Sequence, residues 1–158
     1  MLAYNHLLFG VTAWLGVEAA GYSTPLPLPM ELALVCFGSL LPDIDHPGST
    51  FGRRLLWLSW PIRIFFGHRG ITHSLLAVAA AGWVVAALPG FAACIALGYL
   101  SHLAADYLTG GVPLLWPMPR QYRFPLAFET GGIIEHVVVF SLLGSLLAWL
   151  LNSGGVSG

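Results

Sequence analysis

The sequence predicts an all-α integral membrane protein, a polytopic bundle of four to five transmembrane helices with one interfacial amphipathic segment. Three observations favour this fold class. The chain of 158 residues is 57% hydrophobic and only 8% charged, whereas soluble domains carry about 25% charged residues. Its mean hydropathy is +0.80. Several apolar runs are separated by short segments rich in proline, glycine and charge. We expect residues 1–158 to form a single membrane-embedded domain.

The first half of the chain predicts two membrane helices and one segment at the membrane surface. An apolar run from about residue 2 to 20 forms the first helix, and three prolines within residues 22–29 end it. The second apolar run, 30–41, is short for a full crossing, which takes about 20 residues. After a polar turn at 42–49, residues 53–66 alternate arginine with bulky apolar side chains. This pattern is typical of an amphipathic segment at the level of the lipid headgroups.

The second half predicts a helical hairpin and a final span. The apolar runs 75–88 and 91–108 are separated only by a Pro-Gly turn, so we expect two antiparallel helices that pack together. A polar, proline-rich loop at 109–130 follows, and the last apolar run is 132–151.

The charged residues indicate an orientation in the membrane. If each apolar run crosses once, all six arginines fall on one side, and the positive-inside rule makes that side cytoplasmic. All six histidines, and every acidic residue except Glu18 and Glu31, then lie at one membrane level on the same side. Scattered structural histidines would not gather in this way. We therefore predict one polar site that faces the cytoplasm.

His102 and Asp106 form the centre of that predicted site. They are four residues apart in the apolar run 91–108, so a helix places both side chains on one face. Burying them is costly unless they pair or bind an ion, and imidazole and carboxylate are good ligands for zinc or manganese. For the pair in isolation, a plain interhelical hydrogen bond is the alternative. The polar segments 42–49 and 67–74 add further histidines and aspartates, which favours a metal.

The candidate ligands outnumber what one ion uses, so we predict two divalent ions, zinc first and manganese as the alternative. The predicted ligands come from segments far apart in the sequence: His6, Asp43, Asp45, His46, His73, His102 and Asp106. Other interpretations remain open for several of them. His6 could bond to a neighbouring carbonyl, one of the two aspartates in the 42–49 turn could be a general base or an N-cap, and His46 could orient an aspartate.

Other polar side chains are predicted to act on the substrate. We assign catalytic roles to Asp43, Asp45, Arg69 and Glu135, the last as an acid for the leaving group. We assign substrate contacts to His68, Arg69 and His136. Arginine beside the site suits a phosphate group, which it binds in bidentate fashion. A solvated interfacial patch is the alternative for residues 68 and 69.

Three motifs carry a resemblance to a known family: LLPDIDHPGS at 40–49, GHRGITHS at 67–74 and GYLSHLAADYLTGGVPLLWP at 98–117. In this order they resemble the YdjM-like family of membrane-bound metal-dependent hydrolases, often described as regulated by the SOS repressor LexA. The resemblance covers about residues 4–136. It implies a metal-dependent hydrolase but does not define the substrate.

A more distant similarity to zinc-dependent phospholipase C and the related single-strand nucleases implies roles for the ligands. Those helical enzymes use an early His, an Asp, a His and an HxxxD pair in chain order, and this order is matched here by His6, Asp43 or Asp45, His73, and His102 with Asp106. The similarity implies that Asp106 bridges two ions. Position 1 is Met, where those enzymes have a ligating Trp, and the ligands of their third ion have no counterpart. We therefore expect one or two ions.

Together these features predict a metal-dependent hydrolase at the cytoplasmic face of a bacterial or archaeal inner membrane. The predicted substrate is a phosphoester of a phospholipid or lipid-linked molecule, attacked by a water that the metal activates. A divalent-metal transporter and a non-catalytic scaffold held together by metal are the alternatives. Transporters usually hold their ions at the midplane within inverted repeats, and no repeat is visible here. The net charge of −1 gives no support for a nucleic-acid partner.

Overall fold

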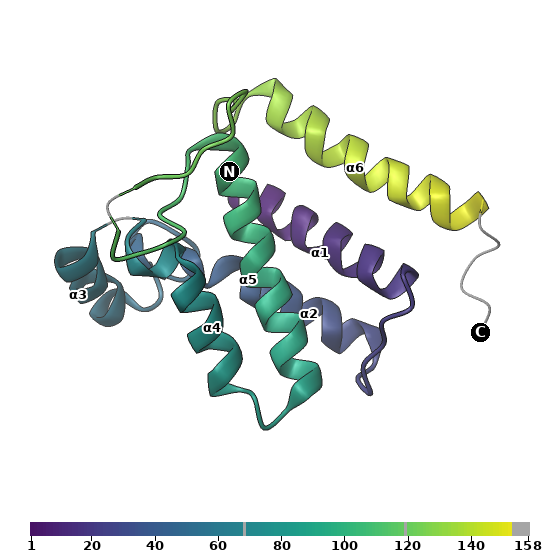
Figure 1. Ribbon diagram of the computed structural model, residues 1–158, viewed down its shortest axis with the longest axis horizontal. Helices are drawn as coiled ribbons and strands as arrows, with labels where there is room; N and C mark the ends of the chain where they lie inside the picture. The colour runs from purple at the N-terminus through teal and green to yellow at the C-terminus, as the bar shows by residue number, and fades with distance from the viewer. Residues whose placement is uncertain (68, 119, 153–158) are drawn as a thin grey trace.

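The structure is a computed structural model that describes residues 1–67, 69–118 and 120–152. These residues contain no strand and form six α-helices and two short 3-10 helices. The elements are α1 (Ala3–Ala19), α2 (Leu28–Leu40), η1 (Pro42–Asp45), α3 (Leu56–Phe66), η2 (Ile71–His73), α4 (Leu75–Val84), α5 (Pro89–Thr109) and α6 (Ile133–Asn152). The all-α fold class is confirmed (Figure 1).

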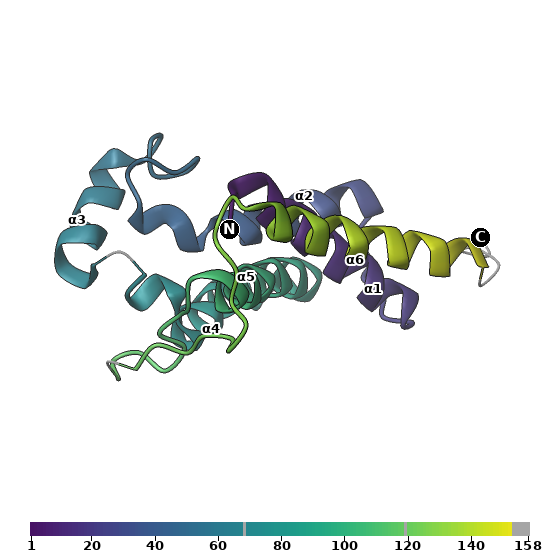
Figure 2. The same ribbon diagram turned by 90° about the horizontal axis from the view of Figure 1, so that it is seen from above.

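Helices α1, α2 and α5 form the centre of the bundle, with α4 packed on α5 and α6 packed on α1 (Figure 1). Seen from above, α3 lies apart from the other helices and α6 lies along the outside of α1 (Figure 2). The predicted hairpin is found, because α4 and α5 are joined by a short turn and pack together. The turn lies at 85–88, however, and the Pro89-Gly90 pair that was predicted to form it opens α5 instead. Ser74 caps α4 by accepting a hydrogen bond from the Ala77 backbone N–H at 3.3 Å.

Two glycines bring α2 and α5 close together. A Cβ atom on Gly38 would overlap the carbonyl oxygen of Ile95, and one on Gly98 would overlap the carbonyl oxygen of Val35. Small residues at a helix–helix contact let the two backbones approach closely. This close approach joins the C-terminal half of α2 to the middle of α5, and both helices carry residues of the site described below.

The outer surface of the bundle is strongly apolar. Large apolar side chains are exposed on α3, α4 and α6, for example Phe65 (78% exposed), Trp83 (79%) and Ile133 (83%). Contiguous apolar surface of this kind is rare on soluble monomers and marks contact with a membrane or a partner. Trp57 and Trp60 on α3 are also exposed, as expected for the predicted interfacial segment.

The lengths of the helices agree only in part with the predicted spans. Two of the described helices are long and apolar enough to cross a membrane, over Gly90–Thr109 and Ile133–Asn152. Helix α2 starts at Leu28, inside the proline-rich segment, and still has only 13 residues. Helix α4 has 10 residues and ends at Val84 rather than 88, so it is about 15 Å long against an apolar thickness of about 30 Å. Four to five transmembrane helices are therefore not confirmed.

Candidate metal centre

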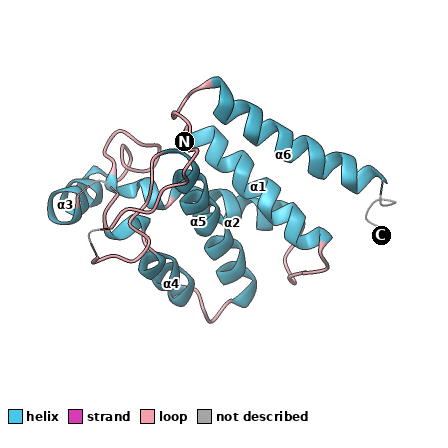
Figure 3. Ribbon diagram, turned by 45° about the horizontal axis from the view of Figure 1, so that its top comes forward, coloured by secondary structure: helices cyan, strands magenta, loops and turns pink. Residues whose placement is uncertain are grey.

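Five of the seven predicted ligands converge at one end of the bundle, where the longer loops also gather (Figure 3). The first turn of α1, the 3-10 helices η1 and η2, and the last two turns of α5 each contribute to this cluster. Among the described residues, two sets of three side chains bring their ligand atoms within 4.8 Å of one another: His6, His102 and Asp106, and Asp43, His73 and His102. All but Asp43 are buried. The predicted convergence is found.

The two carboxylate oxygens of Asp106 face different nitrogens. Oδ1 lies 3.5 Å from His6 Nε2, whereas Oδ2 lies 3.7 Å from His73 Nε2 and 3.8 Å from His102 Nε2. Asp43 Oδ1 lies 3.9 Å from His73 Nε2 and 3.7 Å from His102 Nε2. Two ligand atoms of one tetrahedral zinc ion lie about 3.4 Å apart. The cluster is thus slightly wider than a loaded site, and Asp106 faces His6 through one oxygen and His73 and His102 through the other.

The tautomer of His102 is set by the backbone of α2. Its Nδ1 lies 2.7 Å from the carbonyl oxygen of Ser39, and because a carbonyl can only accept, Nδ1 carries the hydrogen. In the neutral ring, Nε2 then presents a lone pair toward Asp43 and Asp106. This fully buried Nε2 makes no hydrogen bond to any described residue. A lone pair facing two carboxylates is unfavourable unless a cation lies between them. The donor set therefore fits a metal ion.

Asp45 was predicted as a ligand or base, and the structure places it behind His73 instead. Its Oδ2 accepts hydrogen bonds from the backbone N–H of Arg69 at 2.8 Å and the hydroxyl of Thr72 at 2.7 Å. The same oxygen lies 3.5 Å from His73 Nδ1, on the far side of the ring from the cluster. The tip of η2 is further fixed by the Tyr99 hydroxyl, which donates to the carbonyl of Thr72. Asp45 thus orients His73 rather than joining the ligand cluster.

Arg69 reaches the cluster from the loop before η2. Its backbone has the left-handed φ of 58°, which the hydrogen bond from its N–H to Asp45 helps to hold. The guanidinium lies 3.1 Å from Asp106 Oδ2. It is seated against Gly110, the residue after α5, where a Cβ atom would overlap Nη1. Arg69 is therefore held against Asp106 at the edge of the ligand cluster.

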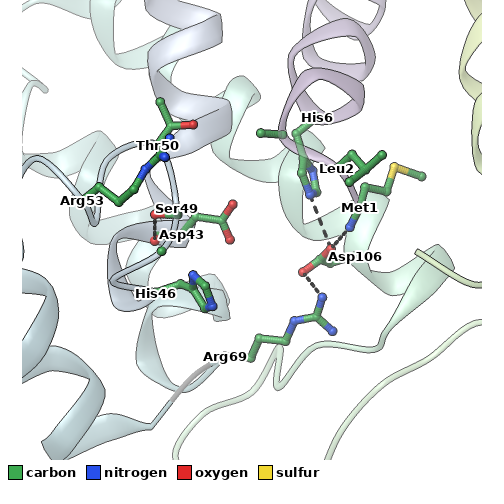
Figure 4. A pocket seen from close by; sticks show the side chains of 12 residues that line it. Met1, Leu2, His6, Asp43, His46, Ser49, Thr50, Arg53, Arg69 and Asp106 are labelled. Carbon is green, nitrogen blue, oxygen red and sulfur yellow. Dashed lines mark hydrogen bonds and ion pairs between the residues drawn. The ribbon is translucent and has the colours of Figure 1, made fainter. Parts of the chain in front are cut away.

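A cavity of about 430 Å³ opens beside the cluster (Figure 4). Its lining includes His6, Asp43, Asp106 and Arg69. His46 also lines it but belongs to neither set of converging ligand atoms. Its ring lies against Gly48, where a Cβ atom would meet the ring 2.8 Å away. The structure therefore places His46 on the cavity wall instead of in the ligand cluster where it was predicted.

Glu135 was predicted as a catalytic acid, and the structure gives it a different position. It is fully buried and does not line the cavity. Its Oε1 accepts from the backbone N–H of Leu2 at 2.9 Å and from the Asn5 amide, and its Oε2 accepts from the Gly131 N–H at 2.8 Å. Both oxygens are used to hold the start of α1 against α6, next to His6. Glu135 is therefore a structural residue of the site.

Of the two remaining predicted substrate contacts, the structure describes only His136. His136 lies outside the cavity lining, with its Nε2 2.8 Å from the Tyr4 hydroxyl. His68 lies outside the described residues. Conversely, sequence reasoning missed a group that contacts Asp106, the Met1 amino group, which lies 2.8 Å from Oδ1. It also missed the Ser39 carbonyl and Gly110, which carry no signal of their own because backbone groups and glycines look alike throughout an apolar sequence.

Comparison with known proteins identifies relatives over most of the chain. A family model described as "YdjM inner membrane protein" matches residues 1–156. The chain is 41% identical to "Inner membrane protein YdjM" of Escherichia coli (strain K12) over 162 residues, covering 90% of this chain and 79% of that protein. It is 32% identical to "Uncharacterized protein YvsG" of Bacillus subtilis (strain 168) over 146 residues, covering 90% of this chain and 89% of that protein. No solved structure matches it significantly.

Proposed function

The chain belongs to the YdjM family of inner membrane proteins, and we propose that it is a metal-dependent hydrolase that cleaves a phosphoester of a membrane lipid or lipid-linked substrate. The observation that carries the proposal is the buried Nε2 of His102. Its tautomer is fixed by Ser39, it faces two carboxylates, and it makes no hydrogen bond to a described residue. A cation satisfies this arrangement, and the adjoining cavity gives a substrate access to it.

The ligand atoms divide into two places for ions. Asp43, His73, His102 and Asp106 Oδ2 would hold one ion, while Asp106 Oδ1 and His6 would contribute to a second. Imidazole with carboxylate is a donor set that suits zinc, with manganese as the alternative. A pair of such ions would supply Lewis acidity and an activated water for the displacement at phosphorus.

The protein's own residues bind and orient the substrate in this proposal. The Arg69 guanidinium is held beside Asp106 by Gly110, where it would bind a phosphate oxygen and stabilise the charge that develops on it. Asp45 fixes the ring of His73 from behind. The cavity lining carries two aspartates, two arginines and the Met1 amino group. Its cations therefore already outnumber its carboxylates, and each divalent ion would add to this positive charge, which favours an anionic substrate.

The exposed apolar surface supports a lipid substrate. Helices α5 and α6 are long enough to span a bilayer, and α1, with 17 residues, is about 26 Å long. In our proposal α1, α5 and α6 cross the membrane, the shorter α2 and α4 are embedded beside them, and α3 lies at the interface with its tryptophans among the headgroups. The arginine distribution favours a site on the cytoplasmic side.

The proposal is tested by metal analysis and lipid hydrolysis on the same detergent-purified samples. The wild-type protein is compared with His102→Ala and Asp106→Ala, and with His136→Ala as a matched histidine outside the cavity. We expect one or two equivalents of a transition metal and release of a phosphate-containing product from phospholipid vesicles, both lost in the first two variants and retained in the third. Bound metal without hydrolysis of any phospholipid would favour the alternative functions, a non-catalytic scaffold or a divalent-metal transporter. Absence of metal from the wild type would overturn the proposal.

A further inference from the structure

The wall of the cavity that faces away from α5 is formed by the loop from His46 to Arg53. Within it, His46, Gly48, Ser49, Thr50 and Arg53 line the cavity, and Figure 4 shows this loop across the opening from His6 and Asp106. None of these residues belongs to the converging ligand sets. The loop therefore bounds space that a substrate would fill beyond its reacting phosphate.

Internal hydrogen bonds hold this loop in shape. The Ser49 hydroxyl donates to the carbonyl of Asp43 at 2.6 Å and accepts from the Gly52 N–H at 2.9 Å. The backbone N–H of Arg53 donates to the Ser49 carbonyl at 3.1 Å. Gly52 is close-packed in this turn, because a Cβ atom there would overlap the carbonyl oxygen of His46. These bonds fix the position of the Arg53 backbone at the cavity, and they link it through Ser49 to the backbone of Asp43.

The charges on the two sides of the cavity differ. The lining carboxylates are Asp43 and Asp106, and both belong to the ligand cluster. The loop wall has Arg53 as its permanent charge, and the Arg53 guanidinium makes no hydrogen bond or ion pair with any described residue. Arg69, in contrast, is already paired with Asp106. The wall thus offers a cation and hydroxyl groups but no acidic partner for an ammonium group.

We propose that Arg53 determines headgroup selectivity, so that the centre accepts phospholipid headgroups without an ammonium group and rejects those that carry one. The inference rests on the proposed function for the identity of the reacting phosphate. The cavity of about 430 Å³ is at the small end of ligand sites, which span about 300–1,000 Å³, so it fits a headgroup with the acyl chains outside. Arg53 is an exposed residue that lines the cavity, so placing an ammonium beside its unpaired guanidinium gives a moderate repulsion, and such repulsion is a source of specificity.

The binding experiment uses two soluble headgroups that share a phosphate and differ in the ammonium group. Glycerol 1-phosphate and phosphoethanolamine are titrated into the purified metal-loaded protein by calorimetry. We expect glycerol 1-phosphate to bind about tenfold more tightly. Arg53→Gln should remove the preference and Arg53→Glu should invert it. The control is Arg54→Glu, which changes an exposed neighbour whose guanidinium donates to the Thr50 carbonyl and which does not line the cavity. This variant should keep the wild-type ratio.

Hydrolysis of phosphatidylglycerol and phosphatidylethanolamine vesicles by the same variants tests whether the selectivity seen with free headgroups also holds for intact lipids. The ratio of kcat/KM for the two lipids should follow the binding ratio. Equal binding of the two headgroups by the wild type, binding of neither, or an equal effect of the Arg54 variant overturns the proposal for Arg53. A preserved binding preference without cleavage of any vesicle overturns the hydrolase and leaves the role of Arg53 standing.

Discussion

Two buried polar clusters lie at opposite ends of the central helices, and only one is built like a binding site. At the far end, Glu31 on α2 is 2% exposed, yet both of its oxygens have donors: Oε2 accepts from Trp14 Nε1 at 3.2 Å, and Oε1 accepts from the Thr24 hydroxyl. At the near end, His6 Nδ1 and His102 Nε2 are buried without a hydrogen bond to a described residue. A cavity adjoins the near cluster.

The difference shows which buried polar groups are structural. When both oxygens of a buried carboxylate accept hydrogen bonds from neighbouring groups, these bonds offset the free-energy cost of removing the carboxylate from water. The Nε2 lone pair of His102, which faces two carboxylates, gains nothing from the fold alone, so its burial indicates a ligand that the chain itself does not supply. Sequence inspection cannot separate the two cases, because Glu31 and His102 are each polar residues within an apolar run.

Removing the carboxylate of Glu31 gives the largest expected effect on stability. Glu31→Ala leaves the Trp14 N–H and the Thr24 hydroxyl without their acceptor and opens a small cavity. We expect a loss of about 2–4 kcal/mol in the free energy of unfolding. Metal content should not change, because this cluster lies at the other end of the bundle. The measurement is unfolding by SDS titration from mixed micelles together with elemental analysis.

Ser23→Ala is the control for this prediction. Ser23 lies in the loop at the same end of the bundle and is exposed, so its removal should cost about 0.5 kcal/mol or less. A loss of bound metal in Glu31→Ala, with the fold retained, would show that the two clusters are coupled and would break the distinction between them.

Asp45→Asn tests a carboxylate that lies behind the near cluster and accepts two hydrogen bonds through its Oδ2. The amide keeps the size of the side chain but weakens its hold on His73 Nδ1, so the ring is less well oriented toward the ions. Loss of a partner that orients a ligating histidine costs about 10–100-fold in metal affinity. Competition with a chromogenic chelator measures the affinity. Glu129→Gln, which removes an exposed carboxylate, is the control for the change in charge.

The alternative assignment of Asp45 gives a different result. If Asp45 were itself a ligand, the Asn variant would lose a whole equivalent of metal, as we expect for Asp106→Ala. An unchanged affinity would instead show that Asp45 only stabilises the loop between η1 and η2.

The sequence predicted the convergence of the site because alternating apolar runs bring the same ends of helices together. His6, Asp43, His73, His102 and Asp106 follow from this topology and from the four-residue spacing on α5. The choice between Asp43 and Asp45 does not follow. Both lie in η1, and a 3-10 helix turns about 120° per residue, so side chains two residues apart point in different directions. That a 3-10 helix forms here is a result of packing, which the pattern of prolines does not reveal.

Glu135 shows a second limit of the sequence. Its place at the start of the last helix correctly predicted that it would lie near the site. Its role depends on whether donors reach it, and these donors are backbone N–H groups of residues 2 and 131 together with Asn5. Because backbone N–H groups do not depend on the side chain, the sequence does not reveal which of them reach Glu135. The lengths of α2 and α4 were similarly uncertain, because apolar runs predict a helix better than they predict its ends.

Gly110→Ala gives the smallest expected effect and tests how the site positions Arg69. The φ of Gly110 is −109°, which alanine adopts without strain, so the change acts only through the methyl group that would overlap the guanidinium. Arg69 must then move away from Asp106. We expect kcat/KM to fall about three- to tenfold with metal content unchanged. Gly82→Ala, whose Cβ would make only a 3.9 Å contact, is the matched control. Combined with Arg69→Ala, the Gly110 change should have no further effect. An additional loss in the double variant would show that Gly110 acts on the end of α5 itself and not only on the position of Arg69.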